Sequence, residues 1–129
     1  MADAVKDERT AQLADIQEGM ARIYWRNAYL NPRERRAATI LFRALDAARI
    51  SISHGEPDAL RLSAAMRELI RSEPLADLEY AELVDAETLE PVTRLRGECL
   101  ALVAARIGST RLIDNLQIEE RDGAFATTL

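Results

Sequence analysis

The stretch "ECLALVAARIGSTRLIDNLQI", Glu98 to Ile118, decides the fold class of this 129-residue chain. Its first ten residues are apolar on both faces and fit either a helix or a central strand. A Gly-Ser-Thr sequence then separates them from a second apolar run, residues 111–118. Two apolar runs joined by a short turn that begins with glycine are typical of a β-hairpin. We therefore predict two antiparallel strands in this stretch.

A long helix is predicted well ahead of the hairpin. Asn31 suits an N-cap, Pro32 the first helical position and Glu34 the third, as in a capping box. The helix is expected to run to about Ile50. Phe42 falls off its apolar stripe, whose core-facing residues are Ala37, Ile40, Leu41, Ala44, Leu45 and Ala48.

The segments between this helix and the hairpin indicate a second helix and a further strand. Asp58 is expected to cap a helix that ends near Arg71. Residues 78–85 are too few for an ordinary helix, and their alternating Leu78, Tyr80 and Val84 favour a strand. Asp85 is expected to cap a short turn after it. Helices followed by a small antiparallel sheet, of about three strands, predict an α+β fold.

Three segments are predicted along the chain. Residues 1–22 carry a thin apolar stripe and are expected to form a modest amphipathic helix ahead of the domain, which must pack on something or fray. Residues 23–118 are expected to form the domain itself. Residues 119–129 are expected to be a flexible tail.

Composition excludes several classes of protein. A hydrophobic content of 48% suits one globular domain, no apolar run approaches the roughly 20 residues of a membrane span, and the net charge of −5 gives no reason to expect nucleic acid. Cys99 is the only cysteine, so we expect no internal disulfide and a cytoplasmic location. His54 is the only histidine, which excludes from this chain any motif that needs two.

The charges are unevenly distributed. Residues 26–49 contain six arginines against two acidic residues, whereas residues 73–98 contain eight acidic residues against two arginines. The two parts can neutralise each other by packing together, or the basic part can bind an anion at the helix N-terminus through Arg33, Arg35 and Arg36. We expect the two parts to neutralise each other, and we favour a solvated face for these three arginines, as is usual on helices.

Three segments resemble, in order and at similar spacing, the C-terminal domain of the pantothenate synthetase (pantoate–β-alanine ligase) family. They are "RNAYLNPRERRAATILFRAL", "EPLADLEYAELVDAETLEPV" and "CLALVAARIGSTRLIDNLQI", within residues 26–118. The resemblance implies a ligase that joins pantoate to β-alanine with Mg-ATP, through pantoyl adenylate, in coenzyme A biosynthesis. It implies that this region is a lid over ATP. A Rossmann-like N-terminal domain would carry the H-x-G-H motif and the substrate pockets.

The family's M-S-S-R-N loop, whose serines and arginine contact ATP phosphates, is matched by "IYWRN". Arg26 and Asn27 match its last two residues, whereas Tyr24 and Trp25 occupy the serine positions. A serine hydroxyl is compact, but tryptophan has only an indole N–H and tyrosine holds its hydroxyl far from the main chain. Arg26 either retains a charge-assisted phosphate contact or pairs with acidic neighbours. Tyr24 and Trp25 either stack on a base or partner or, as we favour, bury apolar surface.

Three other positions receive structural interpretations. Asp114 and Asn115 are expected to be turn and hydrogen-bonding residues, since no second carboxylate is placed to share a metal. Cys99, inside an apolar run, is expected in the core and not as a nucleophile. His54, beside a glycine, is expected to be exposed.

The leading interpretation is therefore the ATP-lid domain of a pantothenate synthetase without its N-terminal catalytic domain. We assign no catalytic residue, and we expect the chain alone to be inactive and to bind neither ATP nor Mg²⁺ tightly. Its partner would be a separate Rossmann-like domain or a second copy. The alternative is a non-catalytic interaction module on this fold, in which residues 1–22 cover Phe42, Tyr24 and Trp25. A third interpretation is an anion or nucleotide binder acting through Arg26.

Overall fold

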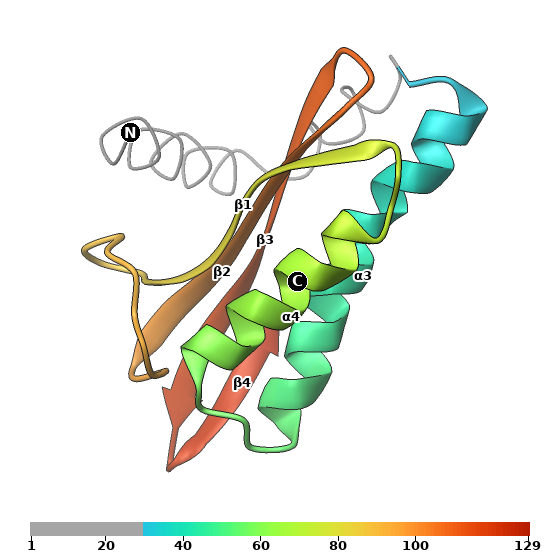
Figure 1. The fold of residues 1–129 in the computed structure, drawn as a ribbon. Coiled ribbons are helices and arrows are strands. Elements are labelled where there is room, and N and C mark those ends of the chain that lie inside the picture. Colours follow the sequence, from blue (N-terminus) through green and yellow to red (C-terminus); the bar gives the residue numbers. More distant parts are fainter. Residues whose placement is uncertain (1–29) are drawn as a thin grey trace.

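Two helices lie on one face of a four-stranded antiparallel sheet in the computed structural model, which describes residues 30–129 (Figure 1). The elements are α3 (Pro32–Ser53), α4 (Ala59–Arg71), β1 (Ala76–Asp85), β2 (Glu98–Ile107), β3 (Thr110–Arg121) and β4 (Ala124–Thr128). The strand order in the sheet follows the sequence. The α+β fold class is thus confirmed, with helices first and the sheet second.

Helix α3 packs on β2, β3 and β4, while α4 packs beside it on β1. The predicted core stripe of α3 is buried in full, because these residues recur at helical spacing and face the sheet. The helix ends at Ser53, slightly later than expected, and Phe42 on its other side is 52% exposed. Among the described residues, neither helix is long and apolar enough to cross a membrane.

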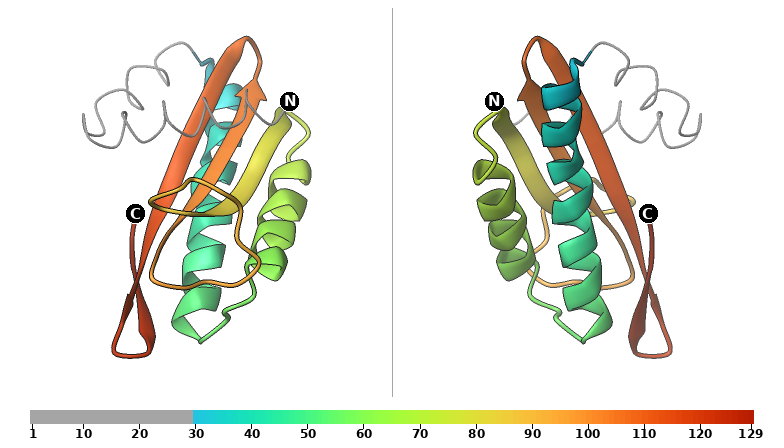
Figure 2. Two further views of the ribbon diagram at one scale, coloured as in Figure 1. Left: turned by 90° about the vertical axis from the view of Figure 1, so that its left-hand side faces the viewer. Right: turned by 90° about the vertical axis from the view of Figure 1, so that its right-hand side faces the viewer.

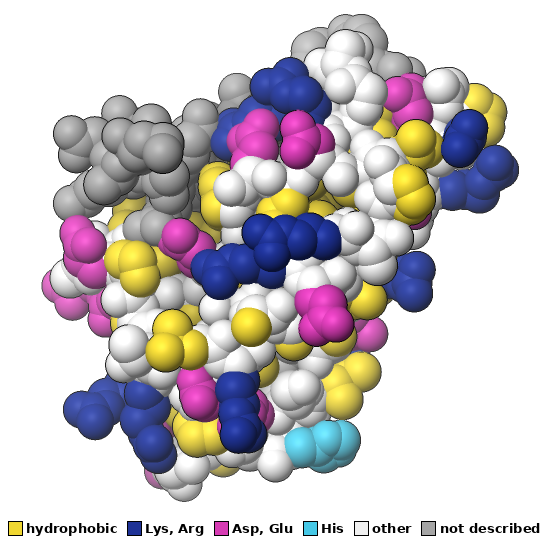
Figure 3. Space-filling model, in the orientation of Figure 1, with side chains coloured by type: hydrophobic (Ala, Val, Ile, Leu, Met, Phe, Trp, Pro, Cys, Tyr) yellow, Lys and Arg dark blue, Asp and Glu magenta, His cyan; other side chains and the backbone are white. Residues whose placement is uncertain are grey.

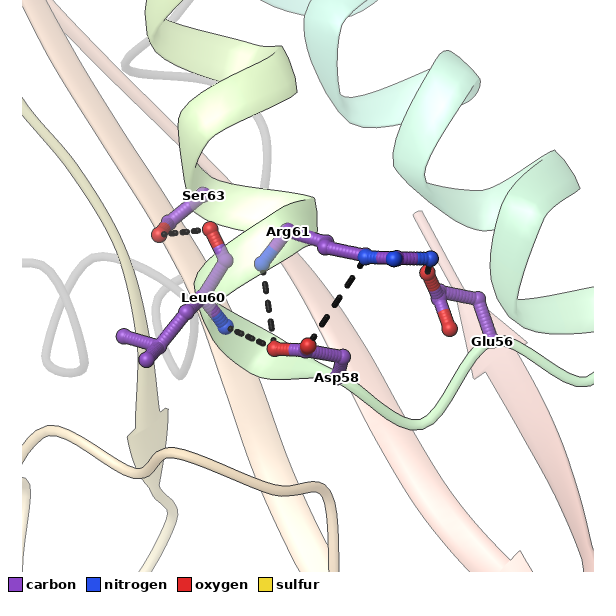
Figure 4. A network of polar contacts seen from close by, with 5 residues as sticks. All are labelled: Glu56, Asp58, Leu60, Arg61 and Ser63. Atoms are coloured by element: carbon purple, nitrogen blue, oxygen red, sulfur yellow. Dashed lines mark hydrogen bonds and ion pairs between the residues drawn. The ribbon is translucent and has the colours of Figure 1, made fainter.

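Asp58 caps α4 as predicted (Figure 4). Its Oδ1 accepts hydrogen bonds from the backbone N–H groups of Leu60 at 3.0 Å and Arg61 at 3.2 Å. The Arg61 guanidinium forms ion pairs with the carboxylates of Asp58 and Glu56. These contacts satisfy N–H groups that have no partner within the helix, so they fix where α4 begins.

Strand β2 is the centre of the core, because both of its faces are buried. Residues 99, 101, 103, 105 and 107 face the helices. Leu100, Leu102 and Ala104 face the other way and pack with Tyr80, Val84 and Leu89. The loop of residues 86–97, which carries Leu89, crosses this second face of the sheet (Figure 2). The apolar run that fitted either a helix or a central strand is therefore a central strand.

A β-bulge interrupts β1 at Glu79, between Leu78 and Tyr80. Leu78 packs against the core on the helix side, whereas Tyr80 packs on the opposite face. The predicted strand is confirmed, but its residues 78, 80 and 84 do not share one face. The extra residue shifts the alternation at that point, and no local pattern in the sequence marks it.

The predicted flexible tail of residues 119–129 is wrong. β3 continues to Arg121, and β4 pairs antiparallel with residues 117–121, with Phe125 partly buried against the core. The turn between them has positive φ at both Asp122 and Gly123, 52° and 81°, as a tight two-residue hairpin turn requires. The sheet therefore has four strands where about three were expected.

Candidate functional site

The residue that the sequence marks for phosphate contact, Arg26, lies outside the described residues, as do Tyr24 and Trp25. Their proposed roles therefore stay predictions. Leu30 is the first residue that the structure describes, and it leads directly into α3. Within the described residues, the candidate site therefore consists of the contacts that fix the start of α3.

The entry to α3 is fixed by its side chains and its backbone. Leu30 is buried in the core, and its carbonyl accepts a hydrogen bond from the Arg35 guanidinium at 3.2 Å. The backbone N–H of Asn31 donates to Glu34 Oε1 at 3.0 Å, and the backbone N–H of Glu34 donates to Asn31 Oδ1 at 2.7 Å. The predicted capping box is thus complete.

The turn between β2 and β3 lies against this capping box. Gly108 has φ +60°, and a Cβ atom at this position would lie only 1.9 Å from Glu34 Oε2. The start of α3 and the turn after β2, which are distant in the sequence, therefore lie against each other. Sequence reasoning identified the turn, but no pattern indicated what it would contact.

The N-terminus of α3 offers few free donors to an anion. The N–H of Glu34 is already bonded to the cap, and the Glu34 carboxylate adds a negative charge there. The Arg35 guanidinium is bonded to Leu30, while Arg33 and Arg36 are exposed. This geometry favours the solvated-face interpretation of the three arginines over an anion site formed by the helix start alone.

The arginines of α3 do not pair with the acidic part of the chain within residues 30–129. Arg49 forms an ion pair with Asp46 of the same helix at 2.7 Å, and none joins α3 to an acidic residue of 73–98 in that range. On the face seen in Figure 3, basic and acidic side chains are interspersed. Within residues 30–129, the expected neutralisation of the basic part by the acidic part is therefore not made through direct ion pairs.

A cluster of charges lies across three strands near the β2–β3 turn. Arg106 and Arg111 stand directly opposite each other, an arrangement that costs stability when two like charges are left alone. The bulge at Glu79 brings a carboxylate to both, 3.8 Å from Arg106 and in hydrogen-bond contact with Arg111. Sequence reasoning missed this cluster, because it depends on strand register and on the bulge.

Asp114 lies in the middle of β3, and not in a turn as expected. It belongs to the row of Leu112 and Leu116, which faces the helices. Burial raises the pKa of its carboxyl group, although the backbone N–H of Asn115 donates to it at 2.8 Å and lowers that pKa in part. The hydrogen-bonding role is confirmed, but the bond is local and the carboxylate is largely desolvated.

The remaining polar candidates are structural. Cys99 is buried, as predicted, and burial raises the pKa of its thiol, which makes it a poor nucleophile. His54 is exposed, as predicted, and caps the C-terminus of α3. Asp85 accepts from the backbone N–H groups of Thr88 and Glu87, which lower the pKa of its carboxyl group. Residues 30–129 contain no group of three or more such side chains that would hold a metal ion.

Comparison with known proteins shows which family has this sequence and fold. A family model described as pantoate-beta-alanine ligase matches residues 12–117. Pantothenate synthetase from Rubrobacter xylanophilus is 56% identical over 91 residues, covering 70% of this chain and 31% of the relative. The enzyme of the same name from Heliobacterium modesticaldum is 50% identical over 94 residues, covering 73% and 34%.

Comparison of the fold with solved structures also finds pantothenate synthetase. The crystal structure of pantothenate synthetase from Thermus thermophilus superposes with a TM-score of 0.65 at 36% identity, covering 70% of this chain and 32% of that one. This chain thus spans about a third of the length of the relatives it matches. The family match includes residues 12–22 of the predicted N-terminal segment and stops before β4. The chain belongs to the pantoate–β-alanine ligase family and corresponds to the C-terminal portion of pantothenate synthetase.

Proposed function

We propose that this region is the lid that covers ATP in a pantothenate synthetase, an enzyme that joins pantoate to β-alanine. The observation that carries this proposal is 50% identity over 94 residues with a pantothenate synthetase. It is supported by the fixed entry to α3, because the Arg-Asn pair of the family's phosphate loop comes just before that entry in the sequence.

In this proposal Arg26 contacts the phosphates of ATP. A guanidinium is always charged and makes charge-assisted hydrogen bonds to phosphate oxygens. The capping box and the buried Leu30 would hold the chain that leads to it, so that less order has to be gained on binding. Bound Mg²⁺ would neutralise phosphate charge. Since residues 30–129 offer no cluster of metal ligands, its ligands would be nucleotide oxygens and residues of the N-terminal portion of the enzyme.

Tyr24 and Trp25 weaken this phosphate site, because neither replaces the compact hydroxyl of serine. These 129 residues alone are therefore expected to bind ATP weakly and to form no pantothenate. Activity requires the Rossmann-like N-terminal portion, from the same or another chain.

A mixing experiment tests the proposal. The N-terminal portion of Heliobacterium modesticaldum pantothenate synthetase is combined with this chain, and ATP-dependent pantothenate formation is measured. We expect a higher rate than either part gives alone. With the Arg26→Ala variant, this increase in rate should be smaller by about 10-fold or more, as expected when a contact to a charged group is lost. Arg36→Ala, which removes an exposed arginine on α3, is the control. A mixture no faster than the N-terminal portion alone would contradict the proposal.

The exposed Phe42 favours a second candidate, a non-catalytic interaction module in which residues 1–22 cover apolar surface. Deletion of residues 1–22 should then uncover that surface and change the oligomeric state in size-exclusion chromatography. A truncated chain that stays monomeric, with unchanged stability, would contradict this candidate.

A further inference from the structure

The two outer strands of the sheet differ in how they are protected from pairing with another chain. β1 lies at one edge, beside α4, and β4 lies at the other (Figure 2). Residues 90–92 cover one end of β1, through backbone hydrogen bonds to Leu83 and Asp85. The rest of β1 carries the bulge at Glu79 and the acidic side chain of Asp77. Cover, bulges and charges are the features by which proteins keep an edge strand from pairing with another chain.

β4 lacks these features. Its residues, Ala124–Thr128, include neither a charged residue nor a proline, and its register with β3 is unbroken. No segment within residues 30–129 pairs with its outer side. β3 extends past β4 over residues 110–116, but that stretch carries Arg111 and Asp114. β4 is therefore the uncharged edge of the sheet, and its own sequence presents no like charges to a second copy.

The backbone groups on the outer side of β4 can be identified from β3. The Glu120 N–H donates to the Gly97 carbonyl at 3.0 Å, so the backbone of Glu120 is directed toward the β2 side and away from β4. In an antiparallel pair, two opposite residues direct their N–H and C=O groups either toward each other or both outward. Phe125 lies opposite Glu120, so its N–H and C=O point outward, as do those of Thr127 two residues later.

An antiparallel pairing of two β4 strands about a two-fold axis at Ala126 uses these outward groups. Phe125 of each copy would lie opposite Thr127 of the other, and the two residues would exchange backbone hydrogen bonds. Their side chains lie on the helix-facing side, where Phe125 is only partly buried against the core. An aromatic residue opposite a β-branched one is a favourable cross-strand pair, so this register is preferred over its neighbours.

We propose that β4 is a self-association edge, through which two copies of this chain join their sheets into one continuous sheet. Because β1 is covered and acidic, β4 of one copy pairs with β4 of the other, and the assembly closes at two copies instead of growing into a filament. The edge lies beyond the family match, which ends at residue 117. The strand is short and the contact small, so the dimer is of the weak class. The inference does not depend on any role in ATP binding.

Sedimentation equilibrium of the full chain, at concentrations up to about 1 mM, tests the dimer because weak complexes have dissociation constants in this range. We expect a monomer–dimer equilibrium. Thr127→Pro removes an outward N–H without removing a hydrogen bond between β3 and β4, and should weaken the dimer by about 10-fold or more. Thr127→Val keeps the N–H and the branched side chain, so it is the matched control and should dimerise as the wild type does.

Cross-linking tests the register and does not require the proline variant to fold. In the proposed pairing the Cα atoms of the two Ala126 residues are about 4.5 Å apart, within the range of roughly 4.4–6.8 Å that a disulfide spans. Those of the two Ala124 residues are about 13 Å apart. Both positions are exposed, and the only native cysteine, Cys99, is buried. With oxidised glutathione, Ala126→Cys should therefore form a disulfide-linked dimer on non-reducing electrophoresis, whereas Ala124→Cys should not.

Three results would overturn the inference. They are a chain that stays monomeric at all these concentrations, equal cross-linking at residues 124 and 126, and a folded Thr127→Pro variant that associates as strongly as Thr127→Val. Species larger than a dimer would contradict the closed arrangement. A chain without activity in the mixing experiment can still dimerise, so this inference and the proposed function fail separately.

Discussion

The two hairpins of the sheet share β3 but differ in what surrounds their turns. Both turns contain a glycine at positive φ, Gly108 in the first and Gly123 in the second. A side chain at Gly108 would meet Glu34, whereas none of the atoms around Gly123 lies within 4 Å of such a side chain. The turn of the first hairpin lies within the family match, whereas the turn of the second lies beyond its end at residue 117. Both turns thus reverse the chain through a glycine at positive φ, but only the turn of the first hairpin also makes a tertiary contact.

The largest expected difference between the hairpins concerns their apolar residues. Leu116 faces the helices in the β2–β3 hairpin and is 0% exposed, while Phe125 of β4 is only partly buried. Leu116→Ala should lower the free energy of unfolding by about 2–5 kcal/mol. Phe125→Ala should lower it by about 1 kcal/mol, because less apolar surface leaves the solvent there. Urea unfolding measures both, and equal losses would show that the two hairpins contribute equally to the core.

A smaller difference is expected from the two turns themselves. Gly108→Ala should lower the free energy of unfolding by about 2–3 kcal/mol, from backbone strain and from loss of the hydrogen bond to the capping-box carboxylate. Gly123→Ala should cost about 1–2 kcal/mol from strain alone. The same unfolding experiment tests this, and a cost at Gly123 as large as at Gly108 would mean that Glu34 contributes nothing.

The smallest difference concerns two carboxyl groups of β3 whose pKa values shift in opposite directions. The pKa of Asp114 is raised by burial, so stability is lost as the pH rises from 3.8 through its folded value. The pKa of Glu119 is lowered by Arg121, so stability is lost as the pH falls from 4.5 through its folded value.

Unfolding measured between about pH 3 and pH 7 distinguishes these two carboxyl groups. Asp114→Asn should raise the stability at neutral pH and have no such effect below pH 3.8. Glu119→Gln should slightly lower the stability at neutral pH, and added salt should reduce that effect because this pair is exposed. Effects of the same sign for the two substitutions would contradict the assigned environments.

Local interactions explain which parts of the fold could be predicted. The caps of Asn31, Asp58 and Asp85 are bonds between residues two or three positions apart, and the core stripe of α3 repeats at helical spacing. The Gly-led turn at residue 108 was also recognisable from sequence alone. Each of these features is fixed by neighbours in the chain, so the sequence pattern was sufficient.

The features that were missed depend on contacts between distant residues or on a weak strand. Asp122-Gly123 is a strong hairpin signal, but the charged residues before it and the small residues of β4 after it were read as a tail. The bulge at Glu79 and the contact of Gly108 with Glu34 exist only once the strands and α3 are packed. The assignment of Arg26, Tyr24 and Trp25 came from family resemblance and remains a prediction, because these residues lie outside the described range.

The most direct test of the central claim is a chimeric enzyme. This chain replaces the matching third of Thermus thermophilus pantothenate synthetase, and ATP-dependent pantothenate formation is measured with the native residues and with Tyr24→Ser/Trp25→Ser. The account predicts a folded chimera with low activity, an increase when both serines are present, and loss of that increase on Arg26→Ala. A folded chimera that forms no pantothenate with the serines in place, or whose activity does not depend on Arg26, would contradict it.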